Sequence, residues 1–112
     1  MTLEVLVMGR LLRALRRARG MTQEELASRL GLTQSQVSKV EAGRLERTFH
    51  ETYQHAIELG LHMSELVALW ESAVDRASVL GPAFPGPNCE LATVAVQRVM
   101  QQEAPRLSRA AV

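Results

Sequence analysis

Apolar residues recur at every third or fourth position along most of this chain, which is the spacing that places them on one face of an α-helix. The pattern predicts helices over 3–19, 23–30, 34–42, 49–59 and 63–78. In the first of these, the alternation of Leu3, Val5 and Val7 fits a short strand or an apolar arm equally well. Gly9 lowers helix propensity by about 1 kcal/mol relative to alanine, so it is a candidate for the true start of this helix.

Three of the predicted helices begin with the signature of a capping box, a threonine followed three residues later by Glu or Gln. The pairs are Thr22 with Glu25, Thr33 with Gln36, and Thr48 with Glu51. In such a box each side chain accepts a hydrogen bond from the other residue's backbone N–H. Gly31, between the first two helices, can adopt the left-handed conformation that ends a helix. The stretch Thr22–Gly43 therefore predicts two short helices joined by a sharp turn.

The second of these two helices has few apolar anchors. Val37 and Val40 point to one side, and polar residues fill the other: Gln34, Ser35, Gln36, Ser38 and Lys39. An outer face of amides, hydroxyls and one cation is suited to contact a polar partner. This arrangement is typical of a helix-turn-helix recognition helix.

The helices that follow are expected to complete a core. Between 49 and 59, a stripe formed by Phe49, Tyr53, Ala56 and Ile57 is predicted to face inward. The next helix has a longer stripe: Leu66, Leu69, Trp70, Ala73, Val74 and Ala77.

A boundary is expected at 81–88, GPAFPGPN, because its three prolines disfavour helix in the residues before them. A last helix is predicted from Cys89 to about Glu103, ended by Pro105, with a narrow apolar stripe along it. The expected organisation is an all-α helix-turn-helix domain in 1–80, a linker in 81–88, and a C-terminal helix and tail in 89–112.

Composition agrees with an all-α fold and adds a charge asymmetry. Hydrophobic residues make up 46% of the chain but aromatic ones only 4%, so Leu, Val, Ala and Met must fill the core. The net charge is only +1, yet residues 1–47 contain nine Lys or Arg against five Glu, and residues 48–112 contain four Arg against seven Asp or Glu. The basic half includes the two short helices, as a nucleic-acid-binding face requires.

Several classes of protein are disfavoured by the sequence. One cysteine, Cys89, permits neither an internal disulfide nor a thiolate metal cluster, although a thiol at a helix start can act as a redox sensor. His50 and His62 are far from each other in helical phase and there is only one cysteine, so no metal site is expected. No run of about 20 apolar residues suggests a membrane span, and no catalytic constellation or phosphate-binding glycine loop suggests an enzyme. We expect a cytoplasmic protein, bacterial and nucleoid-associated or phage-encoded, without a cofactor.

The run from about Gly9 to Glu71 resembles the phage-repressor and Cro-like helix-turn-helix family, also called the xenobiotic-response-element type. The similarity rests on TQEELA, the turn glycine and the VSKVEAG ending, followed by an amphipathic helix, LG and SELVALW. The resemblance implies a compact five-helix domain in which the second helix supports the third in the DNA major groove. It also implies an internal ion pair between Arg16 and Glu41 that holds the domain together.

The sequence departs from the family pattern around its fourth helix. Arg47 stands where a proline is common, and Thr52 and His55 stand where apolar residues are usual. We expect His55 to be a hydrogen-bonded core histidine, with a surface position or a pH-sensitive contact as alternatives.

The family pattern also assigns candidate DNA contacts. Gln34, Ser35 and Lys39 match base-contacting positions, and Gln36 is added because it lies beside them. Gln23 matches a phosphate-contacting glutamine at a helix start. Further phosphate candidates are Ser38, Arg44 and Arg47, and more weakly Arg10 and Arg19.

One such domain reads few base pairs, so we expect a homodimer on a two-fold operator, acting as a transcriptional regulator and most often a repressor. The predicted interface consists of Trp70, Val74, Ala77, Leu91, Val94 and Val99. In one alternative the last helix folds back on its own domain. In another, the protein is an antitoxin or adaptor whose segment 81–112 binds another protein.

Overall fold

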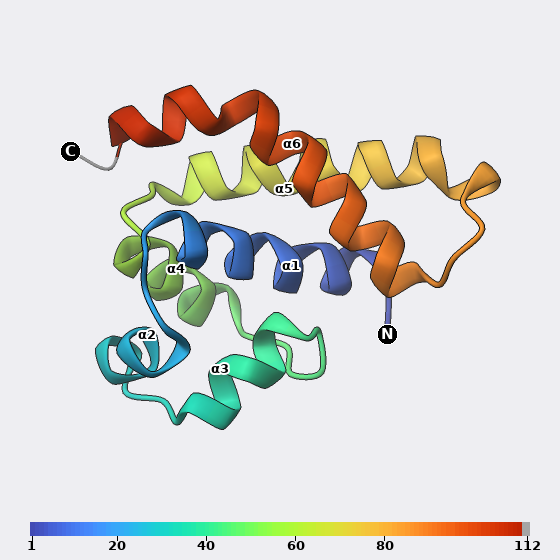
Figure 1. Cartoon of the computed structure of the whole chain (residues 1–112). Helices are drawn as coiled ribbons and strands as arrows, with labels where there is room; N and C mark the ends of the chain where they lie inside the picture. Colours follow the sequence, from blue (N-terminus) through green and yellow to red (C-terminus); the bar gives the residue numbers. More distant parts are fainter. Residues whose placement is uncertain (111–112) are drawn as a thin grey trace.

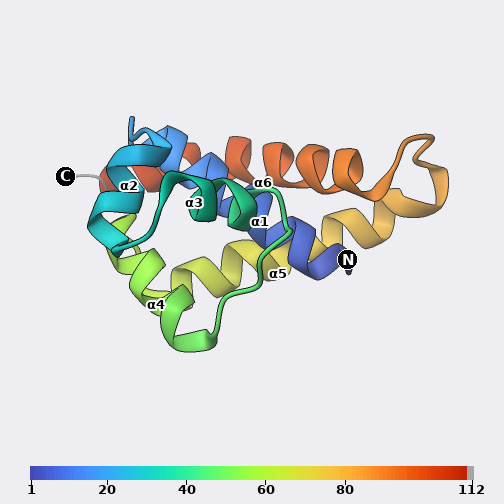
Figure 2. The same cartoon turned by 90° about the horizontal axis from the view of Figure 1, so that it is seen from below.

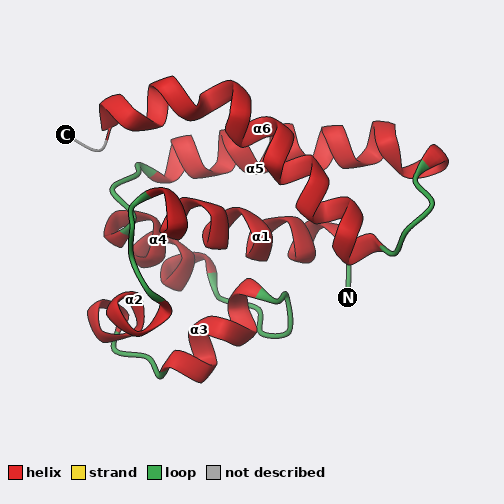
Figure 3. Ribbon diagram, viewed as in Figure 1, coloured by secondary structure: helices red, strands yellow, loops and turns green. Residues whose placement is uncertain are grey.

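All regular secondary structure in the described part of the chain is helical, which confirms the all-α prediction (Figures 1 and 3). The structure is a computed structural model that describes the backbone of residues 1–110 and the side chains of residues 1–103. Its elements are α1 (Leu3–Ala18), α2 (Gln23–Leu30), α3 (Gln34–Glu41), α4 (Phe49–Glu58), α5 (Met63–Leu80), the short 3-10 turn η1 (Gly81–Ala83) and α6 (Asn88–Ala110).

Helix α1 lies in the middle of the molecule and packs against α3, α5 and α6 (Figure 1). Its residues Val7, Leu11 and Leu15 are buried in one continuous apolar core that extends from α1 to α6. Helices α2 and α3 lie on the side of α1 opposite to α6 (Figure 1). The position of α3 therefore depends on its contacts with α1.

The first helix begins before Gly9, so the strand or arm considered for its first residues is wrong. Helix α1 starts at Leu3, where the Thr2 hydroxyl accepts a hydrogen bond of 3.3 Å from the Val5 N–H. Gly9 lies within the helix, and a Cβ atom on it would come within 2.6 Å of the Val40 carbonyl oxygen and 2.8 Å of that of Glu41. The glycine is needed because the backbones of α1 and α3 meet there.

We predict that Gly9→Ala destabilises the protein although alanine is the better helix former. The added methyl group meets two backbone carbonyls that cannot move independently, and such overpacking costs about 1–3 kcal/mol. Thermal unfolding followed by circular dichroism measures the loss. Gly20→Ala is the control, because a Cβ there meets nothing within 4 Å and only the strain of its φ of +68° remains. A melting temperature of Gly9→Ala at or above that of the wild type would contradict the close approach.

The last helix packs against its own chain, in agreement with the fold-back alternative. Helix α6 lies along α1 and α5 and buries Leu91, Ala95 and Val99 against them. The apolar stripe of α6 therefore has its partners within the same chain. The helix also continues through Pro105 to Ala110 instead of ending near Glu103. A proline keeps helical φ and removes one backbone donor, so it weakens a helix without always ending it.

This packing removes half of the predicted dimer interface. Ala77, Leu91 and Val99 are each at most 4% exposed in a single chain, so they are not available to a second copy while α6 is docked. Trp70 and Val74 are partly exposed, as is Val94. The Trp70 indole N–H also donates a 3.0 Å hydrogen bond to the Glu4 carbonyl oxygen, which ties α5 to the start of α1.

Helix α4 turns a different face to the core from the one predicted. Phe49, Tyr53 and Ile57 are 74%, 45% and 52% exposed, and of the predicted stripe only Ala56 is buried. His55 is buried beside Ala56 in place of the larger apolar residues. Hydrophobicity alone therefore does not predict the buried side of α4, because a histidine and a small alanine occupy it.

His55 is a core histidine, as expected, but it is not hydrogen-bonded. The residue is fully buried, and neither ring nitrogen has a hydrogen-bond partner among the described residues. The pKa of His55 is lowered from 6.5 to about 4, mainly by burial and also by the nearby positive charge of Arg47, while Glu41 opposes the shift. The folded protein therefore holds this imidazole in its neutral form.

We predict a loss of stability in acid that depends on His55. In the unfolded chain this histidine takes up a proton near pH 6.5, whereas the folded state resists protonation until about pH 4. Its contribution to the free energy of unfolding is thus complete above pH 6.5 and falls by about 3 kcal/mol as the pH drops to 4. Denaturant unfolding of wild type and His55→Leu should show a shallower pH dependence in the variant. Equal slopes, or the same change in His50→Gln, would contradict this assignment.

Candidate nucleic-acid interface

The stretch from α2 to α3 is shaped mainly by its own local hydrogen bonds. Thr22 and Glu25 form the reciprocal capping box at the start of α2, and Thr33 and Gln36 form the same box at the start of α3. Gly31 between them has φ of +69°, which is the left-handed conformation expected for it. These predictions are confirmed. The sequence thus fixes both the start of α3 and the turn that leads into it.

Helix α3 is anchored on one side and exposed on the other. Val37 and Val40 are 0% and 4% exposed and hold the helix against the core. The four residues predicted to contact bases all lie on the exposed side: Gln34, Ser35, Gln36 and Lys39. In the view of Figure 2, α2 and α3 face the reader with no other helix in front of them.

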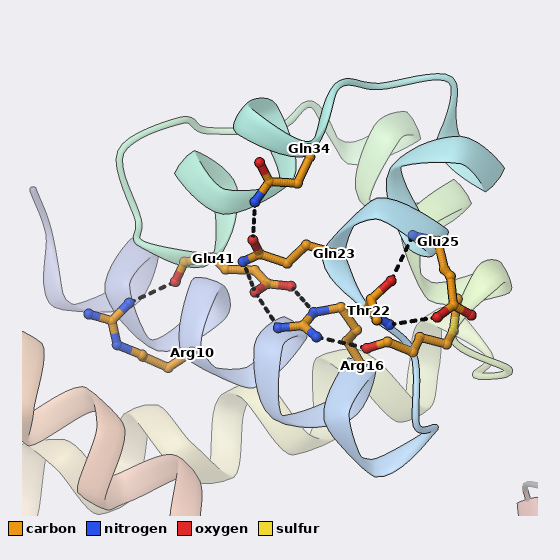
Figure 4. Close-up of polar contacts among 8 residues, drawn as sticks. Arg10, Arg16, Thr22, Gln23, Glu25, Gln34 and Glu41 are labelled. Atoms are coloured by element: carbon orange, nitrogen blue, oxygen red, sulfur yellow. Dashed lines mark hydrogen bonds and ion pairs between the residues drawn. The ribbon is translucent and has the colours of Figure 1, made fainter.

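A buried ion pair joins α1 to the end of α3. The Arg16 guanidinium donates to both carboxylate oxygens of Glu41, with Nε–Oε2 and Nη2–Oε1 distances of 2.7 and 3.0 Å (Figure 4). Arg16 and Glu41 are 7% and 2% exposed. The remaining Arg16 nitrogen, Nη1, donates to the Met21 carbonyl oxygen at 2.7 Å, so the guanidinium also holds the chain that enters α2. The ion pair implied by the family resemblance is present.

The same carboxylate connects to the exposed surface of α3 through two glutamines (Figure 4). Gln23 Nε2 donates to Glu41 Oε1 at 3.0 Å, and Gln34 Nε2 donates to Gln23 Oε1 at 2.6 Å. Because an amide has a distinct donor and acceptor end, the charge of Glu41 fixes the orientation of Gln23 and then of Gln34. Gln34 keeps its carbonyl oxygen and one N–H free for a further partner.

Residues 7–60 match the protein family described as "Helix-turn-helix domain". Over 53 residues the chain is 43% identical to "Uncharacterized HTH-type transcriptional regulator y4dJ" of Sinorhizobium fredii (strain NBRC 101917 / NGR234), an alignment that covers 47% of this chain and 69% of that protein. The chain belongs to the helix-turn-helix transcriptional regulators. The solved structure of the clp gene regulator ClgR from Corynebacterium glutamicum superposes with a TM-score of 0.55 and 26% identity, covering 77% of this chain and 98% of that one.

In this DNA-binding regulator, the side-chain oxygen of Gln36 already accepts a hydrogen bond within the chain, whereas that of Gln34 is free to accept one from another molecule. Gln36 Oε1 accepts a 2.9 Å hydrogen bond from the Thr33 N–H, as part of the capping box. The cap thus holds the amide of Gln36 in one orientation and occupies one of the two lone pairs of its oxygen. Gln36 is therefore a weaker candidate for base contact than Gln34.

Two of the arginines predicted to contact phosphate have partners inside the regulator. Arg10 donates to Thr93 Oγ1 at 3.0 Å and to the Glu41 carbonyl oxygen at 2.7 Å, which links α6 to the end of α3. Arg19 donates to the Leu59 carbonyl oxygen at 2.8 Å. Both side chains thus join elements of the fold. Sequence reasoning missed these roles because the partners lie 31 to 83 residues away.

The other predicted phosphate contacts differ in accessibility. The Arg47 side chain is 8% exposed and turned inward, with its Nε 3.7 Å from Glu51 Oε2, so it is not placed to reach a phosphate. Ser38 lies in α3 and is partly exposed, and Arg44 follows the end of α3 and is exposed. Gln23 is partly exposed at the start of α2, although its side chain also supports Gln34.

Two features are absent from the described residues, a metal-binding cluster and a membrane-spanning helix. They contain no group of three or more His, Cys, Asp or Glu side chains that could hold a metal ion. Among the helices of this same part of the chain, none combines the length and apolar character needed to cross a bilayer.

We predict that Arg16→Met destabilises the regulator strongly at pH 7. The substitution leaves the Glu41 carboxylate buried without its cation, and an uncompensated buried charge costs about 3–5 kcal/mol. Denaturant unfolding of Arg16→Met, Glu41→Gln and the double variant measures the coupling between the two side chains. The double variant should lose much less than the sum of the single losses. Additive losses would show that the two residues act independently.

Proposed function

We propose that this regulator binds a two-fold DNA operator as a homodimer and represses transcription by occupying that operator. The observation that supports it best is the series of contacts from the buried ion pair through Gln23 to Gln34. Orienting an exposed amide in advance is useful for reading a base edge, because less side-chain freedom is lost on binding. A merely solvated helix face has no need of such support.

The exposed side of α3 carries the reading groups of the proposal. Gln34 can accept a hydrogen bond from the adenine N6 amino group and donate one to adenine N7 in the major groove. Lys39 can donate to guanine O6 or N7, and Ser35 can pair with several base edges. A good bidentate contact contributes about 1–3 kcal/mol of discrimination between bases.

Contacts to the DNA backbone would come from fewer residues than the sequence suggested. Of the predicted phosphate set, Arg44 is exposed and Ser38 and Gln23 are partly exposed. Arg10 and Arg19 are partly exposed as well, but their guanidinium groups already donate to partners within the fold. Phosphate contacts fix the register of the protein on the duplex without reading its sequence. Each neutralised phosphate releases condensed counterions, so binding should weaken as salt rises.

A homodimer follows from the small size of one reading surface. One recognition helix contacts only a few base pairs, and two-fold operators double both the contacts and the specificity. The docked position of α6 also favours this proposal over an antitoxin or adaptor with a partner-binding tail. Its buried residues Leu91, Ala95 and Val99 already have partners in the chain.

We predict that selection from random DNA duplexes enriches a two-fold motif and that Gln34→Ala relaxes preference at one base position of each half. The expected cost at that position is about 1–3 kcal/mol of discrimination. Arg44→Ala should instead weaken binding evenly across sequences and lower the salt dependence by about one phosphate contact.

The matched control is Gln101→Ala, which removes an exposed glutamine from α6 instead of α3. It should change neither affinity nor base preference. Enrichment of no motif would overturn the proposed function. An even loss of affinity in Gln34→Ala, with base preference unchanged, would overturn only the role of Gln34.

A further inference from the structure

One side of α4 is exposed, apolar and uncharged. We define the α4 face as the five exposed residues of this helix: Phe49, His50, Tyr53, Gln54 and Ile57. At about 100° per residue, they share one side of the helix. The opposite side is docked through the fully buried His55, and the fully buried Ala56 lies at the edge of the face, next to Phe49.

The chemistry of the α4 face suits a protein and not a nucleic acid. It contains two aromatic residues and one isoleucine, but no Lys, Arg, Asp or Glu. Binding to DNA requires cations that neutralise phosphates. The centres of protein–protein interfaces are instead depleted of charge and enriched in aromatic side chains.

We propose that the α4 face is the surface through which two copies of this regulator pair, an inference that rests on the proposed homodimer. A two-fold interface sets the same patch of both copies against itself. The α4 face can pair with itself because it carries no charge, whereas a face with charges of one sign would repel the same face of a second copy. The face thus supplies the self-complementary surface that the buried residues of α6 do not.

The position of α4 agrees with pairing on DNA. Figure 2 shows α4 at one edge of the molecule and α6 toward the other, while α2 and α3 face the reader. A two-fold axis beside α4 and parallel to this direction of view would place the α3 helices of both copies on the same side. That arrangement lets both recognition helices face one duplex.

The area of the face decides how strong the pairing is. Its two aromatic residues and isoleucine together expose on the order of 300 Å² per copy. Standard stable interfaces bury about 800 Å² per partner, so the free protein should pair weakly. On DNA, neighbouring half-sites hold two copies at a high effective concentration, and a weak contact then suffices.

The test compares duplexes with one and two half-sites of the motif selected from random DNA, using sedimentation to count bound copies. Wild type should bind the double site as two copies and about 100-fold more tightly than independent binding predicts. Ile57→Glu should lose this cooperativity but keep its affinity for the single half-site within about twofold. Val79→Glu is the matched control, because Val79 is an apolar residue 78% exposed on α5. It should retain the cooperativity.

A neutral variant separates pairing from charge and from misfolding. Phe49→Ser combined with Ile57→Ser removes two exposed apolar side chains and adds no charge near DNA. Its melting temperature should stay close to that of wild type while its cooperativity is lost. The inference would be overturned if this variant or Ile57→Glu bound the double site as cooperatively as wild type. It would also be overturned if wild type bound without cooperativity, or if Val79→Glu lost as much cooperativity as Ile57→Glu.

Failure of the proposed DNA binding can be distinguished from failure of pairing through the α4 face. If no motif is enriched, sedimentation of the free protein at several hundred micromolar, without DNA, still tests the α4 face. A concentration-dependent rise in mass that both α4 variants lose and Val79→Glu keeps would support pairing through this face. A wild type that stays monomeric there, or variants that still pair, would overturn it.

Discussion

The carboxylate of Glu41 is the point on which the DNA-reading part of this regulator depends. It lies buried at the end of α3 and accepts hydrogen bonds from Arg16 and Gln23. A buried charge tolerates displacement poorly, because each lost donor leaves part of its desolvation cost uncompensated. The carboxylate therefore positions α3 against α1 and, through Gln23, orients the exposed amide of Gln34. The same carboxylate thus stabilises the domain and orients an exposed side chain of α3.

Helix α1 connects the end of α3 to the rest of the fold. Gly9 lets its backbone approach the end of α3, and Arg10 bridges the Glu41 carbonyl oxygen and Thr93 of α6. The C-terminal helix thus packs on the side of α1 opposite to α3 and is still connected to α3 by one side chain (Figure 1). Helix α6, which the sequence pattern places outside the helix-turn-helix domain, is therefore part of the core of that domain.

Helix α4 buries a polar residue and exposes apolar ones. A fully buried His55 occupies the inner side, and Phe49, Tyr53 and Ile57 occupy the outer side. Burying an imidazole without a hydrogen bond carries a free-energy cost, as does exposing a continuous apolar stripe. A second copy that covers the stripe would recover part of this cost, which gives the α4 face a physical reason to exist.

The sequence by itself determined the local features of this protein. Capping boxes, the turn at Gly31 and the polar outer face of α3 depend on residues three or four positions apart, so Thr22–Gly43 could be read directly. Its likeness to a known family added the Arg16–Glu41 pair. Only the tertiary structure decided which side of α4 is buried, why Gly9 is required, where α6 docks and which arginines are free to reach DNA. Most of these outcomes depend on residues far apart in the sequence, such as the partners of Arg10 and Arg19, which lie 31 to 83 positions away, and short-range periodicity carries no information about them.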